Sequence, residues 1–238
     1  MKLATLMMLT VGAAGVARAE EALPPVADVV AHARAVMDRK PQEMVCKVVV
    51  DTQLLSKTGK PEHDEHREGK ATFRGDDSDV ESQSVVRDGH AMTADEIAEE
   101  RAKILKDRKK SKKKGGGDDD FDLSPLAAKN APNESFALVG RETLWGRPTY
   151  VLEVRAQKQS PQQANGKLWI DAERFVELKG ELTPSEMPPH ADWIKVQEQY
   201  VPGPKDVPAP SLLHIEGAGH MLFMHKQFRT TLRWSDCR

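Results

Sequence analysis

The sequence predicts an α+β fold: one strongly curved antiparallel sheet with helices covering its concave face. About nine segments between Met44 and Trp234 alternate apolar and polar residues, as strands with one wet face do. Only two segments have helical spacing. A sheet of this size covers its apolar face by curling and by taking helices onto the concave side, so this little helix leaves room for an apolar hollow.

Length and composition exclude several classes of protein. The chain has 238 residues, enough for one large domain or two small ones. Lys and Arg number 35 against 37 Asp and Glu, so no basic surface for DNA or RNA is expected. No stretch reaches 18 apolar residues, which excludes a transmembrane helix by this criterion. Two Cys exclude a disulfide-rich mini-fold and a four-Cys zinc site.

The first residues have the pattern of a cleaved secretory signal peptide. Lys2 is followed by an uncharged, mostly apolar run over 3–16, and Ala17-Arg18-Ala19 is an A-x-A cleavage site. We therefore expect a signal peptide over 1–19 and a single mature domain over 20–238. Export permits a disulfide between Cys46 and Cys237. Because Cys237 is the penultimate residue and chain ends fray, the sequence leaves this bond open.

The first helix and the first strands follow the leader. Pro24-Pro25 precedes apolar residues at helical spacing, and Lys40-Pro41 ends the helix. From Met44 the period changes to two, which predicts a strand. A turn over 57–61 and two further strands follow, over 69–74 and 80–87. Asp88-Gly89 then predicts a tight turn.

A second helix is predicted from Thr93 to about Lys110. Thr93 and Glu96 form a capping-box pattern, and acidic residues precede basic ones along the helix, which suits its macrodipole. Its apolar content is thin, so we expect a Lys-rich helical insertion with a flexible loop over about 93–122. The segment 101–114 holds nine basic residues, which either meet anionic lipid headgroups or form a solvated arm neutralised by the aspartates of 118–122.

The remaining chain reads as a series of strands joined by turns. The expected turns are Trp145 to Pro148, Asn165-Gly166 and Asp171 to Arg174. The expected strands are 136–141, 150–156, 167–171, 176–182, 193–201, 211–218 and 221–234.

One stretch resembles a known family. Residues 139–182 read VGRETLWGRPTYVLEVRAQKQSPQQANGKLWIDAERFVELKGEL, in which a G-x-x-x-x-x-G-R-x-x-Y-V-L-x-V hairpin precedes a G-K-L-W-I-D strand. This stretch resembles the LolA/LolB-like superfamily of outer-membrane lipoprotein-sorting proteins, whose relatives include RseB-type periplasmic sensors. The resemblance covers about 45 residues; the order of leader, helix, strands, helical insertion and hairpins agrees over the rest. The Lys-rich insertion departs from the family.

The resemblance implies that the curved sheet is an unclosed half-barrel capped by helices. It also implies a periplasmic carrier that holds acyl chains of a lipid or lipoprotein in the apolar hollow of this half-barrel. Its partners would be lipid or acylated lipoprotein, and membrane-bound donor and acceptor proteins; no cofactor and no catalysis are implied. Such a hollow shields about 0.8 kcal/mol per CH₂ from water. The candidate lining residues, which an ordinary packed core would also contain, are Val48, Val50, Leu152, Val154, Leu168, Ile170, Val176, Leu178, Ile194 and Val196.

Two alternatives remain on the same sequence. The first is an RseB-like sensor or protein-interaction module without carrier activity. The second is a hydrolase or metal-dependent enzyme, for which the sequence offers few residues. His63-Asp64-Glu65-His66 contains residue types that bind metal ions, but a solvated polar turn is the favoured interpretation. His214, His220 and His225 lie close in sequence, and His214 and His220 would meet if the register allowed it; structural or surface roles are favoured.

Overall fold

A computed structural model gives the structure of the chain. It describes residues 22–39, 41–75, 77–113, 123–127, 130–204, 207–221 and 224–238. The predicted signal peptide and the predicted loop over 114–122 lie outside these residues. The described elements, in chain order, are α1 (Val26–Met37), β1 (Met44–Leu55), β2 (Pro61–Arg74), β3 (Asp77–Arg87), β4 (His90–Ala91), α2 (Ala94–Lys113), the 3₁₀ turn η1 (Ala131–Asn133), β5 (Glu134–Leu144), β6 (Arg147–Ala156), β7 (Ala164–Asp171), β8 (Glu177–Pro184), β9 (Ala191–Pro202), β10 (Pro208–Met221) and β11 (Met224–Ser235).

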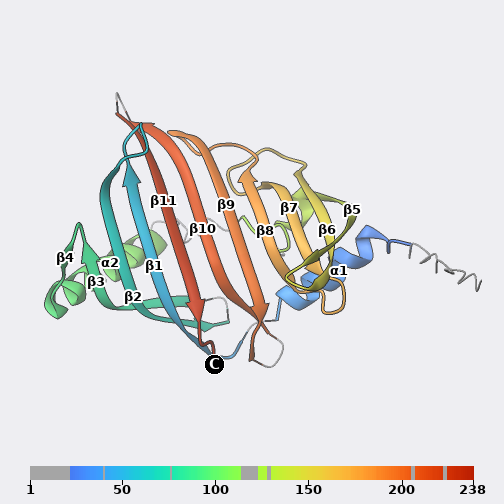
Figure 1. Cartoon of the computed structure of the whole chain (residues 1–238), viewed down its shortest axis with the longest axis horizontal. Helices are drawn as coiled ribbons and strands as arrows, with labels where there is room; N and C mark the ends of the chain where they lie inside the picture. The colour runs from blue at the N-terminus through green and yellow to red at the C-terminus, as the bar shows by residue number, and fades with distance from the viewer. Residues whose placement is uncertain are drawn as a thin grey trace, which may run out of the picture.

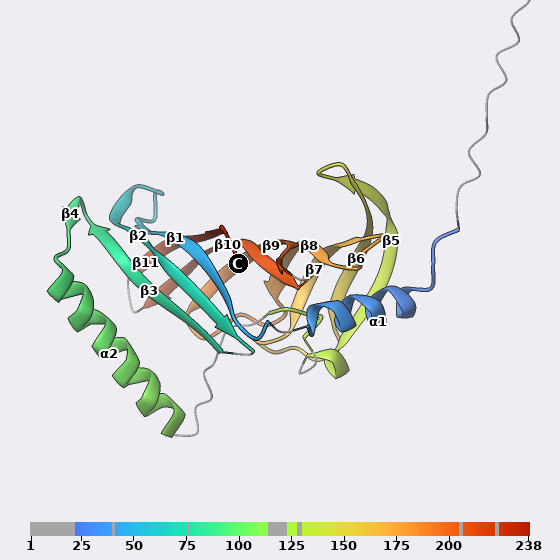
Figure 2. The ribbon, with the colours of Figure 1, turned by 90° about the horizontal axis from the view of Figure 1, so that it is seen from below.

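All eleven strands belong to one antiparallel sheet (Figure 1). Its order is β4-β3-β2-β1-β11-β10-β9-β8-β7-β6-β5, so β4 and β5 are its two edges and the sheet does not close. The sheet is strongly curved, and both helices lie on the same side of it (Figure 2). This side is called the concave face below. The structure confirms the predicted curved, unclosed antiparallel sheet with helices on the concave face.

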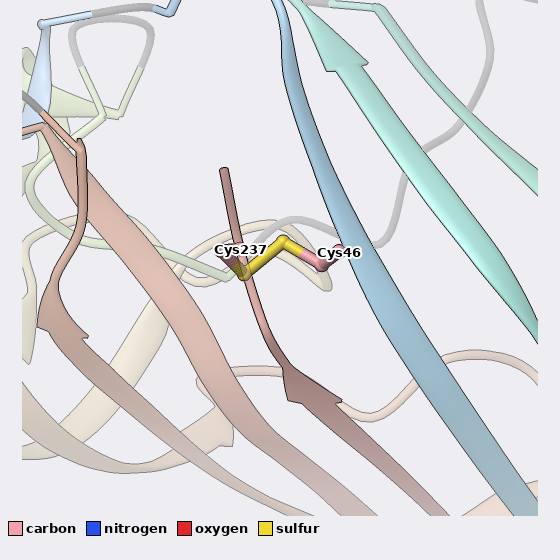
Figure 3. The surroundings of a disulfide bond; sticks show 2 residues. All are labelled: Cys46 and Cys237. Carbon is pink, nitrogen blue, oxygen red and sulfur yellow. A yellow bond between two sulfur atoms is a disulfide. The ribbon is translucent and has the colours of Figure 1, made fainter.

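The sheet has a seam between β1 and β11. The strands β2 to β4 follow β1 along the chain, whereas β11 ends the long meander that begins at β5, so this one pairing joins the two parts. A disulfide between Cys46 of β1 and Cys237 closes the end of the seam (Figure 3). The bond that the sequence left open is therefore formed in the structure. Trp234, Met44 and Ala209 pack around it.

Local chemistry explains the predicted elements that the structure confirms. In α2, the Oγ1 of Thr93 accepts a hydrogen bond from the N–H of Glu96, and the N–H of Thr93 donates to the Glu96 carboxylate. This is the predicted capping box. Asp88 and Gly89 both have positive φ, as the tight turn between β3 and β4 requires.

Three sequence-based expectations were wrong. The strand after the first turn is longer than expected, because β2 begins at Pro61 rather than at residue 69, so His63 to His66 lie in a strand and not in a turn. Asn165-Gly166 lies inside β7, where a side chain at 166 would collide with the carbonyl oxygen of Glu181. Met221 ends β10 instead of opening the last strand. Each error concerns a polar or glycine-containing segment, whose pattern strands and turns share.

Candidate functional site on the concave face

Alternation along the strands separates the two faces of the sheet. Val50 of β1 is opposite Leu232 of β11, which is opposite Leu213 of β10. Two residues further along, Thr52, Thr230 and Ile215 form the next row. These rows lie on the same face as the buried residues that α1 covers, since Ile215 is opposite Val196 of β9. The concave face is therefore mostly apolar across the middle of the sheet, apart from Thr52 and Thr230, whose hydroxyl groups hydrogen-bond to each other.

The α1 side of this face is a filled core. Val29, Val30 and Ala33 of α1 are buried against the sheet, and Leu123 and Leu126 join the same cluster. Of the ten candidate lining residues, six belong to this cluster; they are Leu152, Val154, Leu168, Ile170, Ile194 and Val196. Val176 and Leu178 pack instead beneath Val36 of α1. Val48 is buried near the seam, and Val50 is half-buried.

The middle of the concave face, between the parts that α1 and α2 cover, is only half-buried. We call this group of apolar side chains the central strip. All of its members are intermediate in exposure, and Leu213, Ile215 and Phe228 also pack against the edge of the α1 core. The members of the central strip are Val50, Leu54, Leu213, Ile215, Phe228 and Leu232.

Sequence reasoning found only Val50 of the central strip. Alternation put Leu54 on a face with Val50, and Phe228 on a face with Leu232, but did not reveal which rows the helices leave uncovered. Gly217 lies opposite Phe228 and makes room for its ring in the central strip. An added Cβ at position 217 would lie only 2.7 Å from this ring. Packing of α1 and α2 decides the exposure, and this packing is not local in sequence.

A cavity of about 340 Å³ opens at the end of the concave face near the disulfide. Most of its lining is apolar, including Met37 of α1, Phe73 of β2 and Trp234 of β11. A larger hollow of about 450 Å³ lies where β8 and β9 separate after pairing over only four residues, 179–182. Leu182 and Val196 line that second hollow, but so do Glu181, Lys195 and Glu216, which lie on the face opposite the central strip. Its position on the sheet therefore separates the larger hollow from the apolar concave face, onto which the first cavity opens.

The two sides of the central strip differ in their polar chemistry. On the α2 side, Arg67 of β2 donates hydrogen bonds to Glu65 and to Glu100 of α2, the second at 2.7 Å. Arg87 of β3 donates to the same two carboxylates. Hydrogen bonding from Arg67 lowers the pKa of Glu100. Burial would raise the pKa of Glu65, but hydrogen bonds from Arg67 and Arg87 outweigh it and lower that pKa. All four groups are therefore held in their charged forms.

On the α1 side, the half-buried Arg34 has two buried donor atoms, Nε and Nη2, without hydrogen-bond partners among the described residues. Its guanidinium lies 5.3 Å from the centre of the Phe136 ring. Burial raises the pKa of the nearby Glu134, one of whose carboxylate oxygens is also buried without such a partner. Burying unpaired donors is costly, so α1 covers the core at some expense in free energy.

The candidate histidines do not assemble a metal centre. His66 pairs with Asp51 of β1 at 2.7 Å, whereas His63 pairs with Asp88 in the turn after β3, so the two imidazoles bond to carboxylates on opposite sides of β2. His214 bonds to Thr231 and does not meet His220. His220 and His225 instead share Asp192 at 2.6 and 3.1 Å. Within the described part of the chain, no group of three or more such residues is arranged to hold a metal ion.

Comparisons with known proteins add the following. No family model matches the sequence, and no curated protein is similar to it. The chain is similar in structure to a DUF1329 family protein from Desulfovibrio piger, with 13% identity, a TM-score of 0.42, and 91% and 93% of the two chains covered. A LolA superfamily protein from Nitrosomonas europaea has 15% identity, a TM-score of 0.35, and 89% and 92% covered. MucB in complex with MucA has 12% identity, a TM-score of 0.28, and 89% and 94% covered.

These neighbours include the superfamily that the sequence resemblance names. Among the described residues, no helix is long and apolar enough to cross a membrane.

Proposed function

We propose that this chain is a lipid or lipoprotein carrier of the bacterial periplasm, exported with a signal peptide that is removed after Ala19. The observation that carries the proposal is the central strip: six apolar side chains in adjacent rows, half-exposed on a concave face. A chain of methylene groups laid along these rows would be shielded from water at about 0.8 kcal/mol per CH₂. The end cavity of about 340 Å³ extends the apolar surface beyond the strip.

The candidate lining residues under α1 belong to the same proposal. They are packed against α1, so an acyl chain reaches them only if α1 moves. The two unsatisfied donor atoms of Arg34 lower the cost of such a movement, because displacing α1 would expose them to water. The strip is then the first binding surface, and the core under α1 is a second one that opens on binding.

One observation favours a second function. The core that the sequence predicted as a hollow is filled by α1, as expected of a protein-interaction module that has no carrier activity. In that case the central strip would contact a protein instead of a lipid.

The test is native mass spectrometry of the protein purified from a periplasm without detergent, followed by titration with the fluorescent fatty acid cis-parinaric acid. The mass also reports whether the chain begins at Glu20. The informative pair of variants is Leu213→Asp and Leu212→Asp, since these adjacent residues are both half-exposed but lie on opposite faces of β10. We expect Leu213→Asp to weaken binding by at least about tenfold, because it places a charge in the strip.

Leu212→Asp should leave the binding almost unchanged. A lipid-free mass, together with no uptake of the fatty acid by the wild-type protein, would reject the carrier and favour the interaction module. Equal loss in both variants would show that the strip is not where the fatty acid binds.

A further inference from the structure

The C-terminal half of α2 is a strongly basic, projecting surface that acyl binding does not explain. Residues 101–114 hold nine basic residues and one acidic residue, Asp107, while the whole chain has a net charge of −2. The described lysines Lys103, Lys106 and Lys110 are exposed and spaced by three and four residues, so they form one stripe along the helix. This segment therefore carries a formal charge of +8 within a chain whose net charge is −2.

Ion pairs with the sheet do not neutralise the described lysines of this stripe. Arg101 is the last described residue of α2 that forms an ion pair with the sheet, through Asp79 and Glu81, both at 2.9 Å. Beyond it, the ion pair given by the described side chains of α2 joins Lys110 to Asp107 at 3.7 Å within the helix. Figure 2 shows the C-terminal end of α2 projecting away from the sheet on the concave side.

Charge along α2 also sets an orientation. Its first turn contains Asp95 and Glu96, whereas the exposed lysines lie in its second half. An anionic surface would repel the first end and attract the second, so the helix would approach with its projecting end. Ile104 and Leu105, which are 44% and 40% exposed, line the gap between α2 and β3 on the opposite side of the helix, so the lysine stripe faces away from the sheet.

We infer that the C-terminal half of α2 docks the protein on the surface of an anionic lipid bilayer, through Lys103, Lys106 and Lys110. Charge complementarity and the outward-facing stripe favour the flat anionic surface of a bilayer, and a soluble polyanion is the alternative that the experiment tests. Docking by this end would turn the concave face towards the membrane, because α2 lies on that face (Figure 2). The inference concerns a different surface from the central strip and is tested separately from it.

The experiment is vesicle flotation with the wild-type protein, using phosphatidylcholine vesicles with and without phosphatidylglycerol. The test variant is Lys103→Gln/Lys106→Gln/Lys110→Gln. The control variant, Lys60→Gln/Lys158→Gln/Lys167→Gln, removes the same charge from exposed lysines outside α2. Each lysine near an anionic surface contributes about fivefold in binding, so the test variant should bind about a hundredfold more weakly. Added salt should weaken wild-type binding.

The control variant should bind nearly as well as the wild-type protein. Absence of wild-type binding to the anionic vesicles would overturn the inference, and would fit neutralisation of the lysines within the chain. Equal loss in the two variants would reduce it to a general charge effect, and binding to heparin without binding to vesicles would replace the bilayer with a soluble polyanion. Uptake of cis-parinaric acid, measured on the same variants, should not change. The outcome of the vesicle experiment is therefore independent of the carrier proposal.

Discussion

The two helices cover the same face of the sheet by different means. In α1, Val29, Val30, Ala33 and Val36 are all buried, and the helix closes an apolar core. In α2, Ile104 and Leu105 stay about two-fifths exposed, and a gap of about 160 Å³ separates the helix from β3. Arginine–carboxylate pairs bridge this gap instead.

The difference indicates which of the two helices is able to move when only salt or pH changes. Apolar burial depends little on salt or on pH near neutrality, and it is lost only with the packing itself. Ion pairs between partly exposed groups weaken with salt and disappear when a carboxylate is protonated. Without a bound lipid, we therefore expect α1 to stay packed on the sheet and α2 to behave as an arm that moves beside the central strip.

The largest expected effect comes from placing the same charge in each helix. Ala33→Asp puts a carboxylate at a position of zero exposure in the α1 core, whereas Ala102→Asp puts it on the exposed side of α2. An uncompensated buried charge costs about 3–5 kcal/mol, so Ala33→Asp should lower the free energy of unfolding by that amount. Ala102→Asp should cost less than about 1 kcal/mol, its helix-propensity difference.

Urea unfolding followed by circular dichroism measures both changes. If the two substitutions cost the same, the contrast between a packed and a tethered helix is wrong. If Ala33→Asp is tolerated with α1 displaced and cis-parinaric acid binding retained, α1 is itself a lid.

The disulfide gives the next effect, because it joins the two parts of the sheet that carry these helices. The bond closes a loop across 191 residues of sequence and lies at the β1–β11 seam. Changing both cysteines to alanine should lower the free energy of unfolding by about 2–4 kcal/mol. Urea unfolding of this double variant, compared with the oxidised wild-type protein, is the measurement. A negligible change would mean that strand pairing alone fixes the seam.

The disulfide lies at a strand pairing that the sequence did not predict. Strong alternation predicted most strands, and caps and turn residues such as Thr93 and Asp88 predicted their boundaries, since these signals are local. The pairing of β1 with β11 brings together residues from opposite ends of the chain, and no local signal reports it. The central strip was missed for the same reason: Leu213 and Phe228 alternate like any core residues, and only the placement of the helices leaves them half-exposed.

The smallest effect tests the tether of α2 directly. Glu100 receives hydrogen bonds from Arg67 and Arg87, and its pKa is lowered, mainly by Arg67. Because this pKa is lower in the folded protein than in the unfolded chain, the tether is complete at pH values above the ordinary 4.5 and is lost as the pH falls through the lowered value. Glu65, whose pKa is also lowered, adds to the same loss in acid.

Glu100→Gln should therefore cost about 1–2 kcal/mol at neutral pH and should make stability less dependent on acid. Spin labels at Ala102 and Lys60 would report the distance from α2 to the sheet, and labels at Ala31 and Lys60 would report it for α1. We expect the α2 distance to lengthen in acid, in high salt and in the variant, while the α1 distance stays constant. If acid, high salt and Glu100→Gln all leave the α2 distance unchanged, then contacts other than these ion pairs hold the helix in place.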